Sequence, residues 1–161
     1  MAPQTHRLVD SPLGILTLVG TDGRLSGLYM EDHRPGPAVE ALGDRVRTGF
    51  DAELEQLGDY FAGHRRIFDL PLEPEGTPFQ RRIWASLRAI PYGQTRSYAE
   101  LARAIGNPAA IRAVAMANAR NPISVIVPCH RVIGSDGRLT GYAGGLARKR
   151  FLLDLEAATA A

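Results

Sequence analysis

The stretch from Ser97 to Arg120, SYAELARAIGNPAAIRAVAMANAR, carries the signals for two short helices joined by a tight turn. Ser97 and Glu100 have the S-x-x-E spacing of a capping box, and Gly106 is suited to end the helix that this box begins. Asn107-Pro108 then predicts the start of a second helix, which continues to the end of the stretch. Two such helices predict a helix-turn-helix, a motif common in DNA-binding proteins but also present in proteins that never contact nucleic acid.

The segments on either side predict a small domain of helices and strands around this motif. Upstream, Thr77-Pro78 supplies the N-cap and first-turn proline of a helix that ends near Ile90. Downstream, an apolar run predicts a strand at 123–127. A turn at 134–137 that is flanked by strands is typical of the wing of a winged helix, and a last helix is expected at 146–157.

Cys129 is the only cysteine of the chain and stands in the run Pro128-Cys129-His130-Arg131. A free thiol has a pKa of about 8.5, so it needs a nearby base or positive charge to react as a thiolate near pH 7. His130 and Arg131 follow immediately, and Pro128 favours a strand end at which Cys129 is exposed. A reactive thiol and a small buried side chain remain equally good interpretations on these local grounds. One cysteine also excludes an internal disulfide and argues against a cysteine-rich zinc site.

The first half of the chain predicts a small antiparallel sheet with one helix. Three apolar runs separated by turn residues lie at 7–9, 15–19 and 25–30. Asp22-Gly23 is a strong hairpin signal, and the apolar residues of 51–62 recur at helical spacing. A short strand is expected at 67–70, before a segment at 71–76 whose prolines and glycine are typical of a linker. Because no chemical cluster stands out, this half is interpreted as a supporting domain.

The net charge of +2 hides two halves of opposite sign. Residues 1–76 carry seven arginines and thirteen acidic residues, a net −6, whereas residues 77–161 carry twelve basic and four acidic residues, a net +8. A strongly basic half predicts a polyanionic partner such as nucleic acid, although basic residues that only solvate a surface would give the same charge. We therefore expect two domains, 1–76 and 77–161.

The sequence shows no signal for a membrane. No apolar run approaches the roughly 20 residues of a membrane-spanning helix, and the first ten residues lack the apolar core of a signal peptide. We expect a cytoplasmic protein that does not bind a membrane.

Several of these motifs together resemble the O6-alkylguanine-DNA alkyltransferases, also called methylated-DNA–protein-cysteine methyltransferases. The residues that carry the resemblance are Pro91-Tyr92-Gly93, Ser97-Tyr98, Gly106-Asn107-Pro108, Arg112-Ala113-Val114, Asn121-Pro122, Pro128 to Ile133 and Gly141-Tyr142. It is highly specific in the second half and looser in the first, where Ser-Pro-Leu-Gly at 11–14 and Tyr60-Phe61 fit the family. The resemblance implies an α/β (α+β) fold, with an N-terminal ribonuclease H-like antiparallel sheet and helix and a C-terminal winged helix-turn-helix domain.

The resemblance also implies a reaction. An alkyl group would move irreversibly from O6 of a damaged guanine, and from O4 of thymine, to Cys129, without a cofactor or metal. His130 would take the thiol proton through a water and Glu156 would orient and charge the imidazole, in the logic of a hydrolytic triad. Asn121 would brace the turn that carries the cysteine. Because a thioether offers water no easy cleavage route, each molecule would act once.

The same resemblance assigns a guanine pocket to Tyr98, Val132, Tyr142, Ala143 and Gly144. Tyr98 would donate to guanine N3, and the backbone N–H of Ala143 would face O6. The carbonyls of Cys129 and Val132 would receive the exocyclic amine. The glycines of 141–145 would let a planar ligand approach the backbone closely.

The expected partner is double-stranded DNA that contains O6-alkylguanine, bound by a monomer, with clustering along the DNA left open. A buried thiol cannot reach a base inside a duplex, so the target nucleotide must flip out. In the family the second helix of the motif enters the minor groove, and Arg112 matches the arginine that fills the vacated stack. The other DNA-binding positions implied are Ala110, Ile111, Ala113, Ala115 and Asn118. Ile111 and Ala115 are larger than the usual Ala and Gly, so they are expected to weaken or reposition groove contact.

Three other functions stay open on the sequence. A cysteine hydrolase would use Cys129, His130 and Glu156 with repeated turnover. A sensor that binds damaged DNA without transfer, as in the alkyltransferase-like proteins, would carry Trp in place of Cys129, so the cysteine argues against this alternative. A transcriptional regulator would prefer one undamaged sequence. Tyr98, Asn121 and Glu156 also have plainer interpretations, as packing, turn and surface residues.

Overall fold

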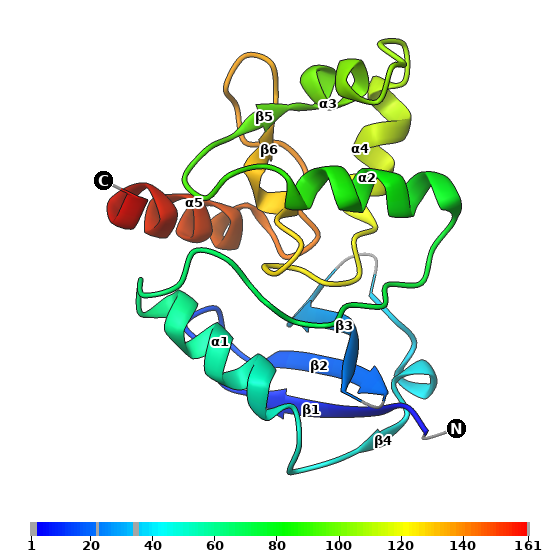
Figure 1. The fold of residues 1–161 in the computed structure, drawn as a ribbon, viewed down its shortest axis with the longest axis vertical. Helices are drawn as coiled ribbons and strands as arrows, with labels where there is room; N and C mark the ends of the chain where they lie inside the picture. The colour runs from blue at the N-terminus through cyan, green and yellow to red at the C-terminus, as the bar shows by residue number, and fades with distance from the viewer. Residues whose placement is uncertain (1–2, 22, 34–35, 161) are drawn as a thin grey trace.

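A computed structural model of the chain describes residues 3–21, 23–33 and 36–160. A sheet with helix α1 (Asp51–Phe61) beside it forms one end of the molecule, and helices α2, α3 and α4 gather at the other end (Figure 1). The predicted mixture of an N-terminal antiparallel sheet and a mainly helical C-terminal part is confirmed. Among the described residues, no helix is both long enough and apolar enough to span a membrane.

The three predicted strands of the first half are present and antiparallel. They are β1 (Thr5–Val9), β2 (Leu16–Thr21) and β3 (Arg24–Met30). Leu18 of β2 pairs with Leu28 of β3, and both side chains are fully buried in the core. The sequence did not predict η1 (Val39–Leu42) or the short strand β4 (Asp44–Arg45), which pairs in parallel with β1 and completes the order β3-β2-β1-β4. Asp22 of the predicted hairpin turn lies outside the described residues.

The segment that follows α1 differs from the prediction. Residues 67–70 form no strand, and the segment 71–76 is not a free linker. The amide of Leu25 donates to the carbonyl of Pro71, and the amide of Glu73 donates to the carbonyl of Leu25. An isolated bridge between Leu25 and Leu72 results. One extended residue is enough for such a bridge, so a segment with the composition of a linker still joins the sheet.

The helix-turn-helix forms much as predicted. Its helices are α3 (Tyr98–Ala104) and α4 (Ile111–Ala119), preceded by α2 (Pro78–Arg88). Thr77 and Ser97 cap α2 and α3 through complete capping boxes. The second helix begins at Ile111 and not at Asn107-Pro108, because the amide of Ala110 donates to the carbonyl of Asn107 and closes a separate turn.

The predicted strand at 123–127 is absent. Ile123 makes only an isolated bridge to Leu28, and the chain then turns through Val125, whose φ of 72° a β-branched residue rarely adopts. Cys129 consequently lies on a short 3-10 turn, η2 (Cys129–Arg131), and not at an exposed strand end. Tertiary contacts have overridden the strand propensity of this apolar run.

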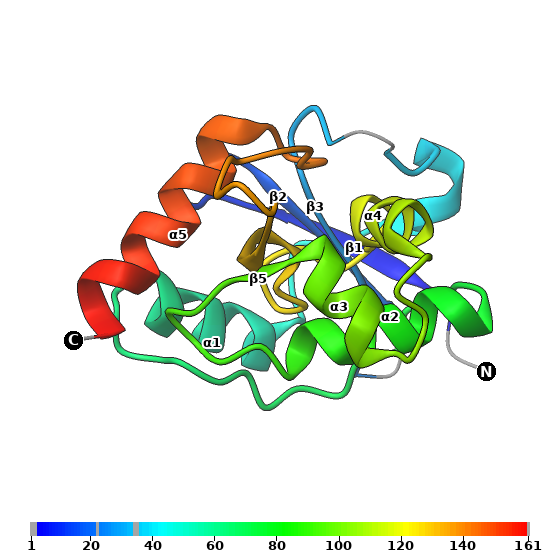
Figure 2. The ribbon, with the colours of Figure 1, turned by 90° about the horizontal axis from the view of Figure 1, so that it is seen from above.

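The predicted wing is reduced to a turn. Strand β6 (Val132–Ile133) pairs in parallel with β5 (Arg96–Ser97), and no strand follows within residues 134–145. The amide of Gly134 donates to the carbonyl of Arg138 and closes the turn. The last helix, α5 (Leu146–Ala160), runs three residues beyond its predicted end. Seen from above, α5 lies on one side of β5 and α4 on the other (Figure 2).

Candidate active site

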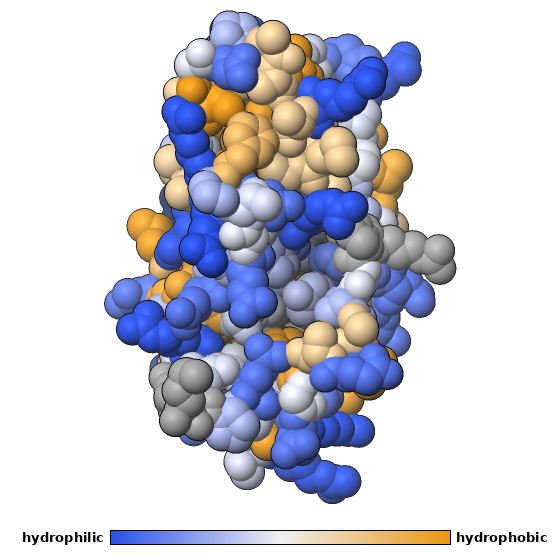
Figure 3. Space-filling model, turned by 90° about the vertical axis from the view of Figure 1, so that its right-hand side faces the viewer, coloured by the Kyte–Doolittle hydropathy of each residue, from blue (hydrophilic) through white to orange (hydrophobic). Residues whose placement is uncertain are grey.

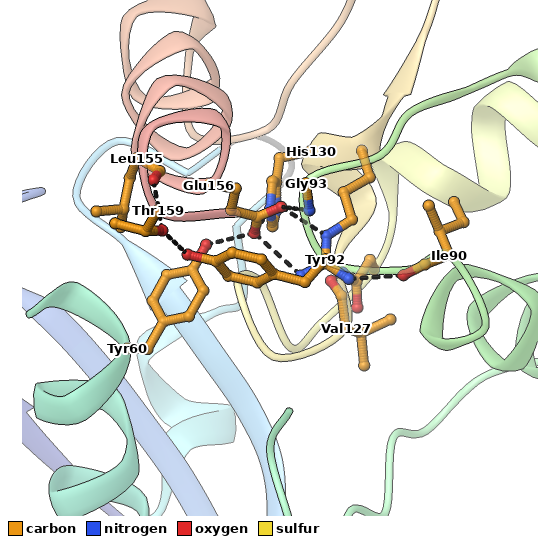
Figure 4. Close-up of polar contacts among 11 residues, drawn as sticks. Tyr60, Ile90, Tyr92, Gly93, Val127, His130, Leu155, Glu156 and Thr159 are labelled. Carbon is orange, nitrogen blue, oxygen red and sulfur yellow. Dashed lines mark hydrogen bonds and ion pairs between the residues drawn. The ribbon is translucent and has the colours of Figure 1, made fainter. Parts of the chain in front are cut away.

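Glu156 of α5 is almost completely buried and is the centre of a polar network, shown in Figure 4. Its Oε2 lies 2.7 Å from Nε2 of His130 and accepts a hydrogen bond of 2.6 Å from the hydroxyl of Tyr60. Arg131 donates to both carboxylate oxygens, at 2.8 and 3.0 Å, and the amide of Gly93 donates to Oε1 at 3.3 Å. The network therefore joins α1, the loop after α2, the η2 turn and α5 through one carboxylate.

The charges of this network fix which nitrogen of His130 carries the proton. Burial raises the pKa of Glu156, but the hydrogen bonds from His130 and Arg131 and the charge of Arg131 outweigh burial and lower the pKa to about 2. Burial lowers the pKa of His130, so the imidazole is neutral. Because an ionised carboxylate only accepts hydrogen bonds, Nε2 of His130 carries the proton and donates to Glu156. Nδ1 has no partner among the described residues and is left as the basic nitrogen.

Cys129 is closed off from solvent, with 4% of its surface exposed, so it does not take the exposed position that Pro128 favoured, and the interpretation as a buried side chain holds for its placement. Burial raises the pKa of the thiol, whereas Asn121, Lys149 and Tyr142 act in the opposite direction. His130 and Arg131, which follow the cysteine in sequence, both hydrogen-bond to Glu156. The resting thiol is consequently protonated and must lose its proton during any reaction.

Two asparagines hold the backbone around the cysteine. Nδ2 of Asn121 donates to the carbonyls of Ile123 and Val127, at 3.3 and 2.8 Å, and its Oδ1 accepts from the amide of Ile123 at 3.0 Å. Asn118 was expected on the DNA-binding face of α4. It is instead buried, and its Nδ2 donates to the carbonyl of Cys129 at 3.4 Å.

Lys149 is a buried cation that the sequence interpretation missed. Its Nζ donates to the carbonyl of Val132 at 2.6 Å and to that of Thr140 at 2.9 Å. Burial lowers its pKa to about 8. The buried residues of α5 are Lys149, Leu152 and Glu156. Their i, i+3, i+7 spacing places them on one face of a helix, so this spacing could have identified Lys149 as a buried residue from the sequence.

The predicted guanine-pocket residues lie around the segment that Lys149 holds. The hydroxyl of Tyr98 donates to the carbonyl of Thr140 at 3.3 Å, and Ala143 is partly buried. Gly144 is buried, and a Cβ there would clash with the sulfur of Met30. Burial and the neighbouring Cys129 raise the pKa of Tyr142, which stays a hydroxyl.

Buried polar atoms without partners cluster near Cys129. Among the described residues they include Oδ1 of Asn118, Oγ of Ser124, Nδ1 of His130 and the hydroxyl of Tyr142. Buried polar groups are nearly always hydrogen-bonded, so a group of unpaired ones is suited to a ligand that has both donors and acceptors. No group of three or more His, Cys, Asp or Glu side chains within the described ranges is arranged to hold a metal ion.

The outer face of α4 carries small and apolar side chains. Ile111 is 44% and Met116 57% exposed, and Arg112 and Ala113 are exposed beside them. Val114 on the opposite face is completely buried. On this side of the molecule the largest group of hydrophobic side chains lies at the helical end, with hydrophilic ones around it (Figure 3). Of the other predicted DNA-binding residues, Ala110 and Ala115 are only partly exposed.

Two family models match the chain. The model described as the DNA binding domain of 6-O-methylguanine DNA methyltransferase matches residues 78–158, and the model described as the ribonuclease-like domain of the same protein matches residues 5–74. These matches confirm the predicted combination of a ribonuclease-like and a DNA-binding part.

Known proteins that are similar to the chain carry names that correspond to these two family models. A methylated-DNA–protein-cysteine methyltransferase of Mycolicibacterium paratuberculosis is 53% identical over 151 residues, which cover 94% of this chain and 91% of the relative. The crystal structure of Mycobacterium tuberculosis OGT in complex with DNA has a TM-score of 0.92 at 48% identity, covering 96% of this chain and 94% of that one. The crystal structure of the O6-methylguanine methyltransferase of Mycobacterium tuberculosis has a TM-score of 0.91 at 47% identity, covering 98% and 95%.

Proposed function

Because the chain belongs to the 6-O-methylguanine DNA methyltransferase family, we propose that it repairs DNA by transferring an alkyl group from O6 of guanine to Cys129. A relative with 48% identity was crystallised with DNA, which supports DNA as the partner of this chain. The unpaired polar atoms near Cys129 support a ligand such as guanine, which has both donors and acceptors.

The reaction balances with the groups that the site contains. The sulfur of Cys129 forms a bond to the alkyl carbon as the bond from that carbon to O6 breaks, giving a thioether and guanine. The proton of the thiol passes through a water to Nδ1 of His130, and a proton ends on the guanine. The ionised Glu156 stabilises the imidazolium that forms in between.

The observation that carries this proposal is the contact between Nε2 of His130 and Glu156. Nε2 donates to an ionised carboxylate at 2.7 Å, so Nδ1 is left as an unpaired base in the residue next to the only cysteine. A resting thiol that burial keeps protonated needs such a base at the moment of transfer.

We further propose that the base reaches the thiol by flipping out of the duplex. Arg112 is exposed on α4, where it can enter the vacated stack, and the exposed Ala113 leaves room for close approach to the minor groove. Tyr98, Val132 and the loop at 142–144 would then hold the base. Activity on O4-alkylthymine, action as a monomer and a cytoplasmic location are parts of the same proposal.

The test is the intact mass of the protein after incubation with duplex DNA that contains O6-methylguanine. We expect a gain of one methyl group per chain, located on Cys129 and not exceeded with excess DNA. A Cys129→Ala variant should still bind the lesion DNA and gain no mass. Repeated hydrolysis of an ester or amide without mass gain would instead establish the cysteine hydrolase, and methyl capture by Cys129→Ala would overturn the assignment.

A further inference from the structure

Tyr60 brings the N-terminal part of the chain into direct contact with the proposed proton relay. It lies on α1, is completely buried, and donates its hydroxyl proton to Oε2 of Glu156 at 2.6 Å. The same Oε2 atom lies 2.7 Å from Nε2 of His130. In Figure 4 the tyrosine extends from α1 toward the carboxylate, which projects from α5 on the other side.

We propose that Tyr60 is a positioning residue for alkyl transfer. By sharing the charge on Oε2 of Glu156, Tyr60 sets how strongly His130 accepts the thiol proton. This proposal rests on the function proposed above. It assigns a part in the chemistry to the first half of the chain, which the sequence interpretation treated only as support.

The geometry supports a strong and fixed hydrogen bond. A distance of 2.6 Å is within the range of charge-assisted O–H···O⁻ bonds, which are about twice as strong as neutral ones. Burial and the neighbouring carboxylate raise the pKa of Tyr60, so the hydroxyl donates at every working pH. Its ring packs against Phe68 at 5.3 Å and edge-on against Tyr92 at 6.2 Å between ring centroids, so the ring has little room to turn.

The direction of the effect follows from charge sharing. Besides Glu156, the charged groups that act on His130 are Arg131, which also donates to Oε2, and Lys149 of α5, and both stay in place in the variant. Part of the negative charge of Oε2 is neutralised by Tyr60 and is therefore not available to stabilise the imidazolium of His130. When the hydroxyl is removed, more of that charge faces His130 and the imidazolium becomes more stable. His130 then stays protonated up to a higher pH, where it cannot accept the thiol proton.

The experiment compares full-length Tyr60→Phe and wild-type protein in single-turnover methyl capture from O6-methylguanine duplex between pH 5 and pH 9. We expect the acid limb of the rate profile to move to higher pH by about half to one unit, with a rate on the plateau that changes less than about threefold. Tyr92→Phe is the matched control, because its hydroxyl contacts Thr159 and its ring packs on Tyr60. The Tyr92→Phe variant should leave the acid limb of the rate profile at the pH of the wild type.

A merely structural role would give a different pattern. A uniform loss of rate at every pH, or the same shift in Tyr92→Phe, would overturn the proposal, as would an unchanged profile. Thermal melting of both variants shows whether each is folded at the pH of the measurement.

A second measurement separates this proposal from the proposed function. The imidazole of His130 is titrated by NMR in a Cys129→Ser background, with and without Tyr60→Phe, which needs no alkyl transfer. A higher midpoint in the double variant supports the link between Tyr60 and His130 even if the wild type captures no methyl. Equal midpoints in the two proteins overturn the link.

Discussion

Nζ of Lys149 lies 2.6 Å from the carbonyl oxygen of Val132, so a completely buried cation on α5 holds the short strand that follows Cys129. The same ammonium donates to the carbonyl of Thr140, at the start of the loop assigned to the guanine pocket. The side chain of Lys149 thus connects α5, the strand β6 that follows the cysteine, and the loop that begins after Thr140.

Replacing Lys149 by Met should lower the free energy of unfolding by about 2 to 3 kcal/mol, because the buried carbonyl of Val132 and the partly buried carbonyl of Thr140 lose a charged donor. Urea denaturation at pH 7 measures this loss. Arg150→Met is the matched control, since Arg150 is exposed and pairs with the exposed Asp154 at 3.8 Å, so its loss should cost less than about 1 kcal/mol. Equal losses in the two variants would contradict the assigned role of Lys149.

Asn121→Ala should destabilise the segment that leads into Cys129. The variant loses three hydrogen bonds to Ile123 and Val127, and the buried groups left without partners cost about 2 to 3 kcal/mol of unfolding free energy. Methyl capture should slow as well. Asn107→Ala, at an exposed turn, serves as the control. If Asn121→Ala were as stable as this control and captured methyl groups at the same rate, the bracing role would be refuted.

Glu156→Gln should reduce both stability and capture. The buried Arg131 would keep its charge without an anionic partner, which costs about 3 to 5 kcal/mol, and the imidazolium of His130 would lose its counter-charge. We expect capture at pH 7 to fall by about 100-fold. Asp154→Asn on the exposed side of α5 should change neither quantity appreciably, and capture at wild-type rate in Glu156→Gln would remove the carboxylate from the relay.

Arg112→Ala should weaken capture from duplex DNA more than reaction with the free base O6-benzylguanine. Only the duplex requires a flipped nucleotide and a filled stack, so we expect about a tenfold or larger loss on DNA and little change with the free base. Arg45→Ala removes an exposed arginine in the first half of the chain and is the control. Equal losses on both substrates would argue against insertion of Arg112 into the stack.

Stability should fall at mildly acidic pH because of His33. Burial, followed by the charge of Arg148, lowers the pKa of His33 from 6.5 to about 4. The unfolded chain takes up a proton below about pH 6.5 while the folded chain does not, so stability is lost as the pH falls from 6.5 to 4. This group alone should make the protein about 2 kcal/mol less stable at pH 5 than at pH 7.

Urea denaturation at both pH values tests this expectation. His33→Gln is neutral in both states, so the difference between pH 7 and pH 5 should shrink by about 2 kcal/mol. His64→Gln, at an exposed position, should keep the full difference. A difference that is unchanged in His33→Gln would rule His33 out as the cause.

The sequence predicted best where the interactions are local. Thr77 and Ser97 each bond to groups three residues away, so the starts of α2 and α3 could be inferred from spacing alone. The strands β2 and β3 followed from apolar runs joined by a short turn. The prediction of a strand at 123–127 was wrong because contacts outside this apolar run decide its shape. Leu28, which is far away in the sequence, bridges to Ile123, and the side chain of Asn121 donates to the carbonyl of Val127.

The sequence by itself determined the family, the single cysteine with histidine beside it, and the charge difference between the two halves. Only the tertiary structure decided that the thiol is buried, that His130 contacts Glu156 through Nε2, and that Tyr60 and Lys149 contact residues around Cys129. The hydroxyl of Tyr60 reaches a carboxylate 96 residues away in the chain. Such a contact is a product of how α1 and α5 pack, and no local pattern of residues encodes it.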